Sequence, residues 1–261
     1  MSPAVPTSTN IANPIGKPPP MKIVSFKICP FVQRVTALLE AKAIHYDIEY
    51  ISLSDKPQWF LDLSPNGQVP VLITDTGTAL FESDAIVEYL EEAYPPLQPG
   101  LAPEDRALNR AWSYLAAKHY LVQCGAQRSP DAPTLGERGA KLGQAFDRVE
   151  RQLGNSRYFS GDQLSMVDIA WLPLLHRAAI IEQRSGYDFI GQRPKLKAWQ
   201  RAVLRTGLAE RSVAEDFDAA FAAFYLSDET HLGRGGAAQM PQPTAASVPE
   251  RQTCCAPTCC R

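Results

Sequence analysis

The fold is decided by the stretch MKIVSFKICPFVQRVTALL, which runs from Met21 to Leu39. Over Met21–Lys27 apolar and polar residues alternate, with β-branched side chains among them, and this pattern predicts a strand. Apolar residues then recur at helical spacing within Pro30–Ala43. They are Val32, Val35, Leu38 and Leu39. The stretch therefore predicts a strand that leads directly into a helix.

Cys29 lies at the junction of these two elements. Pro30 suits the first helical turn, where its missing N–H costs nothing. The N–H groups and the positive dipole end of the helix stabilise a thiolate there, and each unit by which a thiol pKa falls corresponds to about 1.4 kcal/mol of preference for the anion. The junction is thus a place where a protein activates a thiol. The alternative is a buried, inert cysteine that caps an ordinary helix.

Val32 occupies the position where a thioredoxin-like redox motif has its second cysteine. Cys29 therefore has no resolving partner within the motif. A mixed disulfide formed on Cys29 must be cleared by a thiol from outside, and an abundant small thiol such as glutathione is the economical candidate.

The composition excludes several classes of protein. The chain has 261 residues, 45% of them hydrophobic, which allows one large domain or two smaller ones, and we expect two. The formal net charge is −2 and Lys and Arg are scattered, so we expect no nucleic-acid partner. No apolar run approaches the roughly 20 residues that span a bilayer, and no secretory signal precedes the first strand. We expect no membrane association and a cytoplasmic location.

Most of the cysteines lie at the end of the chain. Four of the six fall within the last eight residues, which leaves Cys29 and Cys124 in the predicted folded part. This usage suits a reducing compartment rather than a disulfide framework. The tail cysteines Cys254, Cys255, Cys259 and Cys260 are candidate ligands for a soft metal ion, but adjacent cysteines on a short flexible peptide make a poor tetrahedral site, so no metal site is assigned. Reversible oxidation, or service as a resolving thiol for Cys29, are further possibilities.

Further elements follow the first helix in the order of a small mixed sheet. Residues 1–20 are rich in proline, a composition that predicts a flexible lead. A second strand over His45–Ile51 completes a strand, helix, strand unit. After a short helix over Asp55–Leu63, two strands and a helix are expected. They are Gln68–Ile73, Ala79–Phe81 and a helix that begins near Ser83, with a hairpin turn at Asp75–Gly77.

After Pro103 the strand patterns end and helical ones take over, so the domain boundary is placed there. Helices are predicted around Leu108–Val122, over Leu135–Leu153, after the capping motif Ser165–Asp168, over Pro194–Leu204 and over Val213–Leu226. Pro173 should kink the third of them. Residues 227–261 turn to Gly, Ala, Pro, Gln and Thr, which predicts a disordered, cysteine-rich tail.

Four short motifs stand in one order along the chain. They are CPFVQRV at Cys29–Val35, KPQWF at Lys56–Phe60, NGQVPVL at Asn66–Leu72 and FESD at Phe81–Asp84. In this order and spacing they resemble a glutathione transferase, in particular the cysteine-type members: the omega class, the dehydroascorbate reductases and related bacterial proteins. The resemblance covers the folded body, including the capping motif Ser165–Asp168.

The resemblance implies the glutathione transferase architecture. An α/β thioredoxin-like N-terminal domain over residues 21–94 would bind glutathione, and an all-α C-terminal domain over residues 104–226 would bind the second substrate. By the same resemblance Cys29 forms the mixed disulfide with glutathione, and the backbone of Val69 pairs with its cysteinyl backbone. The Val69–Pro70 bond should then be cis, the alternative being a trans proline at a strand start.

The remaining glutathione-binding residues also come from the resemblance. The carboxylate of Glu82 fits the ammonium of the γ-glutamyl end, and Ser83 at a helix start fits its carboxylate, although Ser83 is also a plain N-cap. Lys56 matches the family position that contacts the glycyl carboxylate of glutathione. The alternative is that Lys56 is an ordinary solvated lysine on the surface. Phe31 flanks the thiol or is a core aromatic of the first helix.

A cysteine at the active position favours disulfide chemistry over conjugation. The first hypothesis is a glutathione-dependent thiol transferase or reductase that acts on small mixed disulfides or dehydroascorbate. The alternatives are a transferase that conjugates or isomerises a small electrophile, and a non-catalytic binding or scaffold protein on the same fold. The resemblance also implies a homodimer, while the second substrate cannot be named from the sequence.

Overall fold

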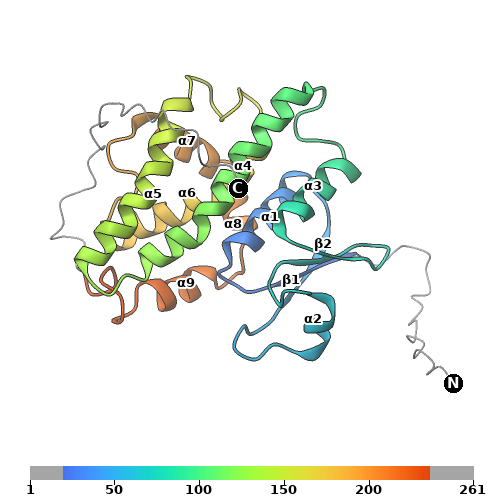
Figure 1. The fold of residues 1–261 in the computed structure, drawn as a ribbon, viewed down its shortest axis with the longest axis horizontal. Coiled ribbons are helices and arrows are strands. Elements are labelled where there is room, and N and C mark those ends of the chain that lie inside the picture. The colour runs from blue at the N-terminus through green and yellow to red at the C-terminus, as the bar shows by residue number, and fades with distance from the viewer. Residues whose placement is uncertain (1–19, 236–261) are drawn as a thin grey trace, which may run out of the picture. The chain divides into compact units, whose positions relative to one another are not determined.

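The computed structural model describes residues 20–235, and they divide into two compact units. The sheet unit comprises the chain up to Pro99 together with Glu210–Ala214, and the helical unit comprises Gly100–Ala209 and the chain from Glu215. Figure 1 shows the strands of the first unit and the helices of the second. The α/β and all-α parts predicted from the sequence are confirmed as the fold class.

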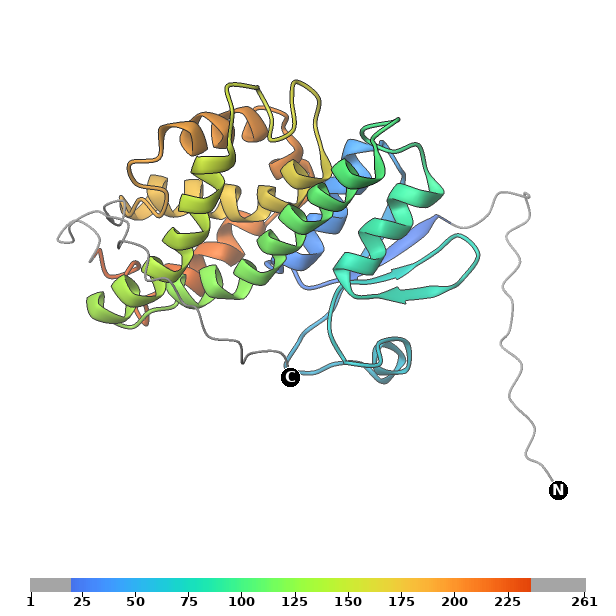
Figure 2. The same cartoon turned by 45° about the horizontal axis from the view of Figure 1, so that its top comes forward.

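The sheet unit has a βαβ half followed by a ββα half. Its elements are β1 (Met21–Ser25), α1 (Pro30–Ala41), β2 (Tyr46–Tyr50), α2 (Gln58–Leu63), β3 (Val71–Ile73), β4 (Ala79–Phe81) and α3 (Ser83–Ala93). The four strands lie in the order β2-β1-β3-β4, and β1 pairs with β2 in parallel and with β3 antiparallel. Figures 1 and 2 show α1 and α3 on one side of the sheet and α2 on the other. This strand order makes β2 an edge strand.

The core of the sheet unit lies between the sheet and helices α1 and α3. Ile23 of β1 and Leu72 of β3 are fully buried neighbours in the antiparallel pair. The helices cover them with fully buried side chains, namely Val35, Leu38 and Leu39 from α1 and Ile86, Val87 and Leu90 from α3. These positions recur at helical spacing in the sequence, so each helix contributes one apolar face to the core.

The helical unit contains six helices among the described residues. They are α4 (Pro103–Gln127), α5 (Ala132–Gln152), α6 (Met166–Ser185), α7 (Pro194–Leu204), α8 (Leu208–Arg211), which falls at the division between the units, and α9 (Phe217–Tyr225). Helix α6 contacts both α4 and α7. Most of its side chains are buried, which fits a central helix that is apolar nearly all round.

A capping box begins α6, as the sequence predicts. The hydroxyl of Ser165 accepts from the N–H of Asp168, and the carboxylate of Asp168 accepts from the N–H of Ser165 at 2.7 Å. The same carboxylate also accepts from the N–H of Phe159 at 3.0 Å and the indole N–H of Trp199 at 2.6 Å. Because Asp168 joins three separate segments, it fixes the start of α6 to its surroundings. Helix α6 continues through Pro173.

Several predicted element starts differ from the structure. Helix α4 begins at Pro103 rather than near Leu108, α5 at Ala132 rather than Leu135, and β3 at Val71 rather than Gln68. Helix α2 begins at Gln58 rather than Asp55, because Pro57 disfavours the helical conformation in the residue before it. Helix α9 begins at Phe217 rather than Val213. Residues 210–214 instead belong to the sheet unit, where the hydroxyl of Thr36 donates to the carbonyl of Ser212 at 2.7 Å.

The described chain extends past Ser227, where the sequence places the start of the tail. Residues 227–235 form turns. The N–H of His231 donates to the carbonyl of Ser129 at 2.8 Å, and Leu232 is 2% exposed. The short stretch is therefore packed in spite of its polar composition, since one buried leucine and a few hydrogen bonds suffice to hold it. The predictions for residues 1–19 and for the tail cysteines lie outside the described residues.

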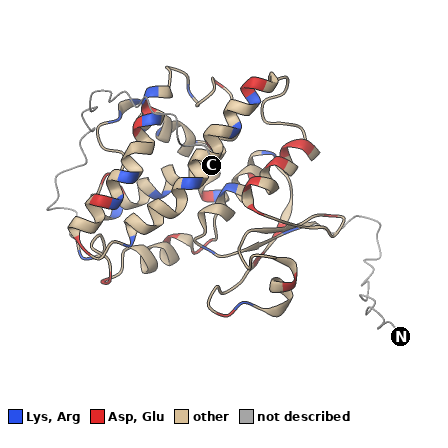
Figure 3. Cartoon of the chain, in the orientation of Figure 1, with Lys and Arg blue, Asp and Glu red and all other residues tan. Residues whose placement is uncertain are grey.

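Charged residues of both signs occur along the helices (Figure 3). Acidic side chains gather on α3, which carries Asp84, Glu88, Glu91 and Glu92. Within residues 20–235, none of the helices combines the length and the apolar character that crossing a bilayer requires.

Candidate functional site

Cys29 is the N-cap residue of α1. Its backbone is extended, with φ −77° and ψ 122°, and its carbonyl accepts from the N–H of Gln33 at 3.1 Å, the first hydrogen bond of the helix. Pro30 fills the first helical position. Cys29 is half-buried, and it forms no disulfide with another described residue. The thiol therefore lies at the positive end of a helix dipole, the environment that lowers the pKa of a thiol.

A polar pocket lies at the start of α1 and α3. It has a volume of about 140 Å³ and is lined by Phe31, Asn66, Gln68, Val69, Pro70, Glu82 and Ser83. The pocket brings together five of the residues that the sequence assigns to glutathione, namely Phe31, Val69, Pro70, Glu82 and Ser83. The Val69–Pro70 bond is cis, as predicted.

A tight turn shapes one wall of the polar pocket. The hydroxyl of Ser64 donates to the carbonyl of Gln68 at 2.9 Å and accepts from its N–H at 3.0 Å. Gly67 lies inside this turn at φ +60°, a conformation that favours glycine. The turn leads directly into Val69, and neither the N–H nor the carbonyl of Val69 hydrogen-bonds to another residue in the described part of the chain. Both groups are thus available to a ligand.

Glu82 and Ser83 form the opposite wall. Glu82 is the N-cap of α3 and has φ +67°, a conformation that costs a residue with a side chain about 1–3 kcal/mol. The amide of Asn66 donates to the Glu82 carboxylate at 2.7 Å, which joins the two walls. Ser83 is 5% exposed and begins α3. The pocket therefore presents a carboxylate beside a helix N-terminus, a combination that suits a ligand with an ammonium and a carboxylate on one carbon.

Three residues near the pocket were not assigned a role from the sequence. Asn66 and Gln68 line it, and the NGQVP motif itself was the available signal. Arg34 of α1 forms an ion pair with Asp84 of α3, and the Arg34 side chain is 1% exposed. This pair joins α1 to the first turn of α3, and the starts of both helices border the pocket.

Lys56 and Cys29 lie beside the polar pocket rather than in its lining. The ammonium nitrogen of Lys56 is 3.7 Å from the position that a Cβ would take on Gly67, so it borders the turn. Cys29 lines a smaller hollow together with Val32 and Tyr50. Cys29 and Phe31 are two positions apart at the start of α1, and they border the two different hollows.

Models of two glutathione S-transferase domains match the chain. The N-terminal domain model covers residues 28–93, and the C-terminal domain model covers residues 133–202. The chain belongs to the glutathione S-transferase family. The family predicted from the four motifs is thus confirmed.

Similarity to individual members of the family supports this assignment. Glutathione S-transferase omega-1 of Rattus norvegicus is 34% identical over 187 residues, which is 69% of this chain and 74% of the relative. Glutathione S-transferase DHAR2 of Arabidopsis thaliana is 34% identical over 154 residues, 58% of this chain and 68% of the relative. The crystal structure of rice GST1 in complex with glutathione has the same fold, with a TM-score of 0.68 at 23% identity over 80% of this chain and 99% of that one.

Two buried ionisable groups of the helical unit lie outside the lining of the polar pocket. Burial raises the pKa of Asp168, and its hydrogen bonds to Ser165, Phe159 and Trp199 oppose that effect. Burial, together with the neighbouring charge of Arg177, lowers the pKa of His176 to about 3, so its imidazole is neutral at physiological pH. Among residues 20–235, no group of three or more His, Cys, Asp or Glu side chains is arranged to hold a metal ion.

Proposed function

We propose that this protein is a glutathione-dependent thiol transferase or reductase of the omega and dehydroascorbate reductase type. The observation that carries the proposal is the thiol of Cys29 at the N-cap of α1. A hydroxyl at this place would donate to the glutathione thiolate and leave it to attack an electrophile. A thiolate instead attacks disulfides and forms a mixed disulfide itself. Relatives that bear the omega and DHAR names support this choice.

Glutathione binds in the polar pocket with its γ-glutamyl end at α3. The carboxylate of Glu82 takes the ammonium group, and the hydroxyl and N–H of Ser83 take the carboxylate. The backbone of Val69 pairs with the cysteinyl unit, which directs the sulfur of glutathione toward the start of α1. The glutathione complex of the rice protein, which shares this fold, supports a ligand of this kind.

Two further residues complete the proposed glutathione site. Lys56, which borders the turn at Gly67, attracts the glycyl carboxylate. Phe31 lines the pocket at the first turn of α1 and limits the access of water to the reacting sulfur atoms. The proposed site therefore uses one charged or polar group for each charged end of the tripeptide.

The reaction proceeds by two thiol–disulfide exchanges. The thiolate of Cys29 attacks the glutathione sulfur of a mixed disulfide, the substrate leaves as a thiolate that takes up a proton, and Cys29 is left bonded to glutathione. A second glutathione thiolate then attacks the glutathione sulfur of this adduct, which releases oxidised glutathione and restores Cys29. The chain needs no second cysteine in the motif, because the resolving thiol comes from solution.

Intact mass measurement after incubation with oxidised glutathione tests the proposal. The starting protein carries Ser at 254, 255, 259 and 260, so that the tail thiols do not react. We expect one glutathione adduct, its loss in the Cys29→Ser variant, and its retention in the matched Cys124→Ser variant, since Cys124 is also half-buried. An adduct that persists without Cys29 would contradict the proposal.

The same variants separate thiol transfer from conjugation. Cys29→Ser should lose thiol transfer, and a gain in conjugation of a small electrophile would show that a hydroxyl restores the other chemistry. A protein that neither binds a glutathione column nor forms the adduct would instead be a non-catalytic member of the family. The homodimer and the cytoplasmic location implied by the resemblance stay predictions, and sedimentation of the full chain tests the first.

A further inference from the structure

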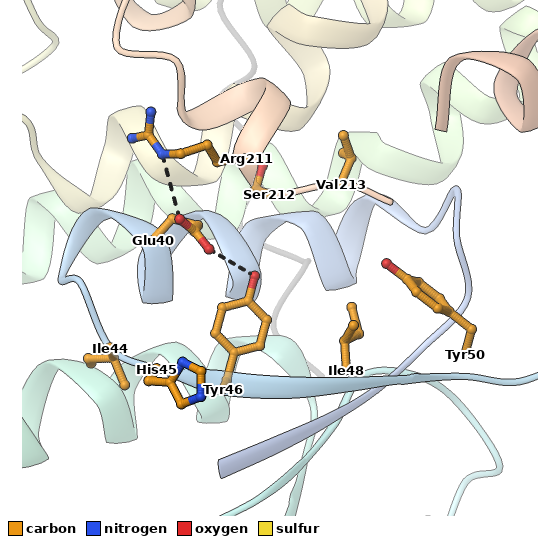
Figure 4. Close-up of a pocket in the computed structure, with 9 residues that line it drawn as sticks. All are labelled: Glu40, Ile44, His45, Tyr46, Ile48, Tyr50, Arg211, Ser212 and Val213. Atoms are coloured by element: carbon orange, nitrogen blue, oxygen red, sulfur yellow. Dashed lines mark hydrogen bonds and ion pairs between the residues drawn. The ribbon is translucent and has the colours of Figure 1, made fainter. Parts of the chain in front are cut away.

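A groove runs along β2, the edge strand of the sheet unit. It has a volume of about 320 Å³. Its lining residues are Glu40, Ile44, His45, Tyr46, Ile48, Tyr50, Arg211, Ser212 and Val213, and Figure 4 shows them. We call it the β2 groove. All of these residues belong to the sheet unit, since Glu210–Ala214 packs there.

The backbone of β2 presents hydrogen-bonding groups on the outer side of the strand. The N–H of Ile51, directly after β2, donates to the carbonyl of Ser25 in β1 at 2.9 Å. Backbone groups alternate in direction along a strand, so those of Asp47 and Glu49 also face β1, whereas the N–H and the carbonyl of Ile48 face away from the sheet. In the described part of the chain no strand pairs with this outer side. The edge can therefore accept a further strand.

The side of β2 that faces α1 offers apolar surface to such a strand. Tyr46, Ile48 and Tyr50 occupy alternate positions of β2, and Figure 4 shows them pointing to the same side. Ile48 is 39% exposed and Tyr50 is 37% exposed. The carboxylate of Glu40 is already engaged, because it accepts from the hydroxyl of Tyr46 at 3.2 Å and lies 3.6 Å from the guanidinium of Arg211. The β2 groove thus suits apolar side chains better than charged ones.

The other face of β2 is acidic. Asp47 and Glu49 lie on it, alternating with the residues of the groove. The ammonium of Lys22 pairs with Glu49 at 3.1 Å. Asp47 is exposed, and its carboxylate has no hydrogen-bond or ion-pair partner among residues 20–235. Opposite charges on neighbouring strands stabilise their pairing, so this carboxylate favours a basic residue on a strand added to the edge.

The same charges disfavour a second copy of the chain at this edge. A symmetric pair of β2 strands runs antiparallel, and directly opposite residues then share one face of the sheet. If both β2 grooves lie on one side and three or more residues of β2 pair, an acidic residue of one strand lies opposite an acidic residue of the other. Like charges in that position are destabilising. A basic strand instead meets the acidic face with the opposite charge.

We propose that the edge of β2 is a docking site for an extended segment of another protein, in which basic residues alternate with apolar ones. The segment adds a strand to the sheet through the outward N–H and carbonyl of Ile48. Its apolar side chains lie on the β2 groove, and its basic side chains lie beside Asp47 and Glu49. The β2 groove shares no lining residue with the polar pocket, so this docking does not depend on the proposed reaction.

Binding of labelled heptapeptides to the full chain, followed by fluorescence anisotropy at low ionic strength, tests the site. One peptide alternates Lys and Val, a second alternates Glu and Val, and a third has the composition of the first with its lysines in one block. None contains cysteine, so disulfide exchange plays no part. We expect the alternating Lys–Val peptide to bind at least tenfold more tightly than the other two. Equal binding of the alternating and blocked peptides, or no binding of either, would overturn the proposal.

A charge reversal on β2 tests the acidic face. Asp47→Lys should weaken binding of the alternating Lys–Val peptide about fivefold or more and strengthen binding of the Glu–Val peptide. The matched control is Asp105→Lys, which makes the same change of charge at an exposed position of α4 and should leave both affinities within twofold. Equal effects of the two substitutions would overturn the proposal, because the net charge alone would then explain the binding.

A proline at position 48 tests the backbone of the edge. Ile48→Pro removes an outward N–H and no hydrogen bond to β1, a place where an edge strand tolerates proline, and it should abolish binding of the Lys–Val peptide. Ile48→Thr keeps the N–H and should retain at least a third of the affinity. Circular dichroism checks the fold, and Asp47→Lys carries the test if Ile48→Pro does not fold. Unchanged binding in a folded Ile48→Pro variant would contradict strand addition.

Sedimentation of the full chain tests the competing occupant. We expect Ile48→Pro to leave the oligomeric state as it is, because the acidic faces of two copies repel each other at this edge. Self-association that Ile48→Pro abolishes would assign the edge to a second copy and overturn the proposal.

Discussion

Replacing Asp168 with Asn should destabilise the helical unit strongly while changing almost no volume. One carboxylate oxygen accepts from the N–H of Phe159 at 3.0 Å and from the indole of Trp199 at 2.6 Å. The other accepts from the N–H and the hydroxyl of Ser165, at 2.7 and 2.6 Å. Asparagine has one acceptor oxygen in place of two, so its NH₂ group must face the donor N–H of Ser165.

The magnitude follows from the groups that lose a partner. The N–H of Ser165 becomes a buried donor without an acceptor, which costs about 1–3 kcal/mol, and the two hydrogen bonds that survive lose their charge assistance, about 1 kcal/mol each. One effect opposes this loss of stability. Burial raises the pKa of Asp168 because it desolvates the charged carboxylate, and the neutral amide of asparagine avoids that desolvation cost. We expect a net loss of about 2–4 kcal/mol in the free energy of unfolding.

Thermal and urea unfolding followed by circular dichroism would measure this loss. For a chain of this size the expected fall in Tm is roughly 4–16 °C. The control is Asp218→Asn, which alters an exposed carboxylate 3.5 Å from Arg184 and should cost less than about 1 kcal/mol. A loss below about 1 kcal/mol for Asp168→Asn would refute the view that this carboxylate holds the start of α6.

Three other predictions follow from buried or bridging groups. The pKa of His176 is lowered to about 3 in the folded protein and is near 6.5 in the unfolded chain, so protonation of the unfolded chain destabilises the fold as the pH falls below about 6.5. Between pH 6.5 and pH 5, urea unfolding should therefore show a loss of about 2 kcal/mol in the free energy of unfolding, and this loss should be absent in His176→Phe. Asn66→Ala removes the hydrogen bond at 2.7 Å to the Glu82 carboxylate and should raise the KM for glutathione about tenfold, measured by thiol-transfer kinetics. Asp84→Ala leaves the guanidinium of Arg34, 1% exposed, without its counter-ion and should cost roughly 2–4 kcal/mol by thermal unfolding, less than for a fully buried pair because Asp84 is half-exposed.

Each of these predictions has a matched control among exposed residues. His45→Phe should leave the pH dependence of unfolding as it is, because His45 is exposed. Gln58→Ala removes an exposed amide whose partner is Asp62 and should leave the KM for glutathione within twofold. Asp105→Ala should cost less than about 1 kcal/mol. A control that behaves like its partner variant would contradict the corresponding argument.

Cys29 and Phe31 lie two positions apart at the start of α1, but they border different hollows, the small hollow beside Tyr50 and the polar pocket respectively. Substitutions in the lining of the polar pocket should therefore change the KM for glutathione, and substitutions that line only the small hollow should spare it.

The sequence by itself determined what local signals encode. Proline at the first helical position makes Cys29 the N-cap of α1, the spacing of Ser165 and Asp168 makes a capping box, and alternating and helical periodicities give the order of the elements. These signals depend on residues that are close together in the sequence, so they can be interpreted without knowledge of the tertiary structure. The boundaries of α2 and α9 were less well determined, because a neighbouring proline and a packed segment decide them.

Only the tertiary structure decided which distant residues meet. The pairs Asn66–Glu82 and Arg34–Asp84 join segments that are 16 and 50 positions apart, and nothing in the local pattern of either segment names its partner. The packing of Glu210–Ala214 in the sheet unit depends on contacts with α1 such as the hydrogen bond from Thr36 to Ser212, which joins residues 176 positions apart. Such contacts form because the interior must be closely packed and its buried polar groups must be hydrogen-bonded. Both requirements apply to the whole fold, so they cannot be derived from any one segment.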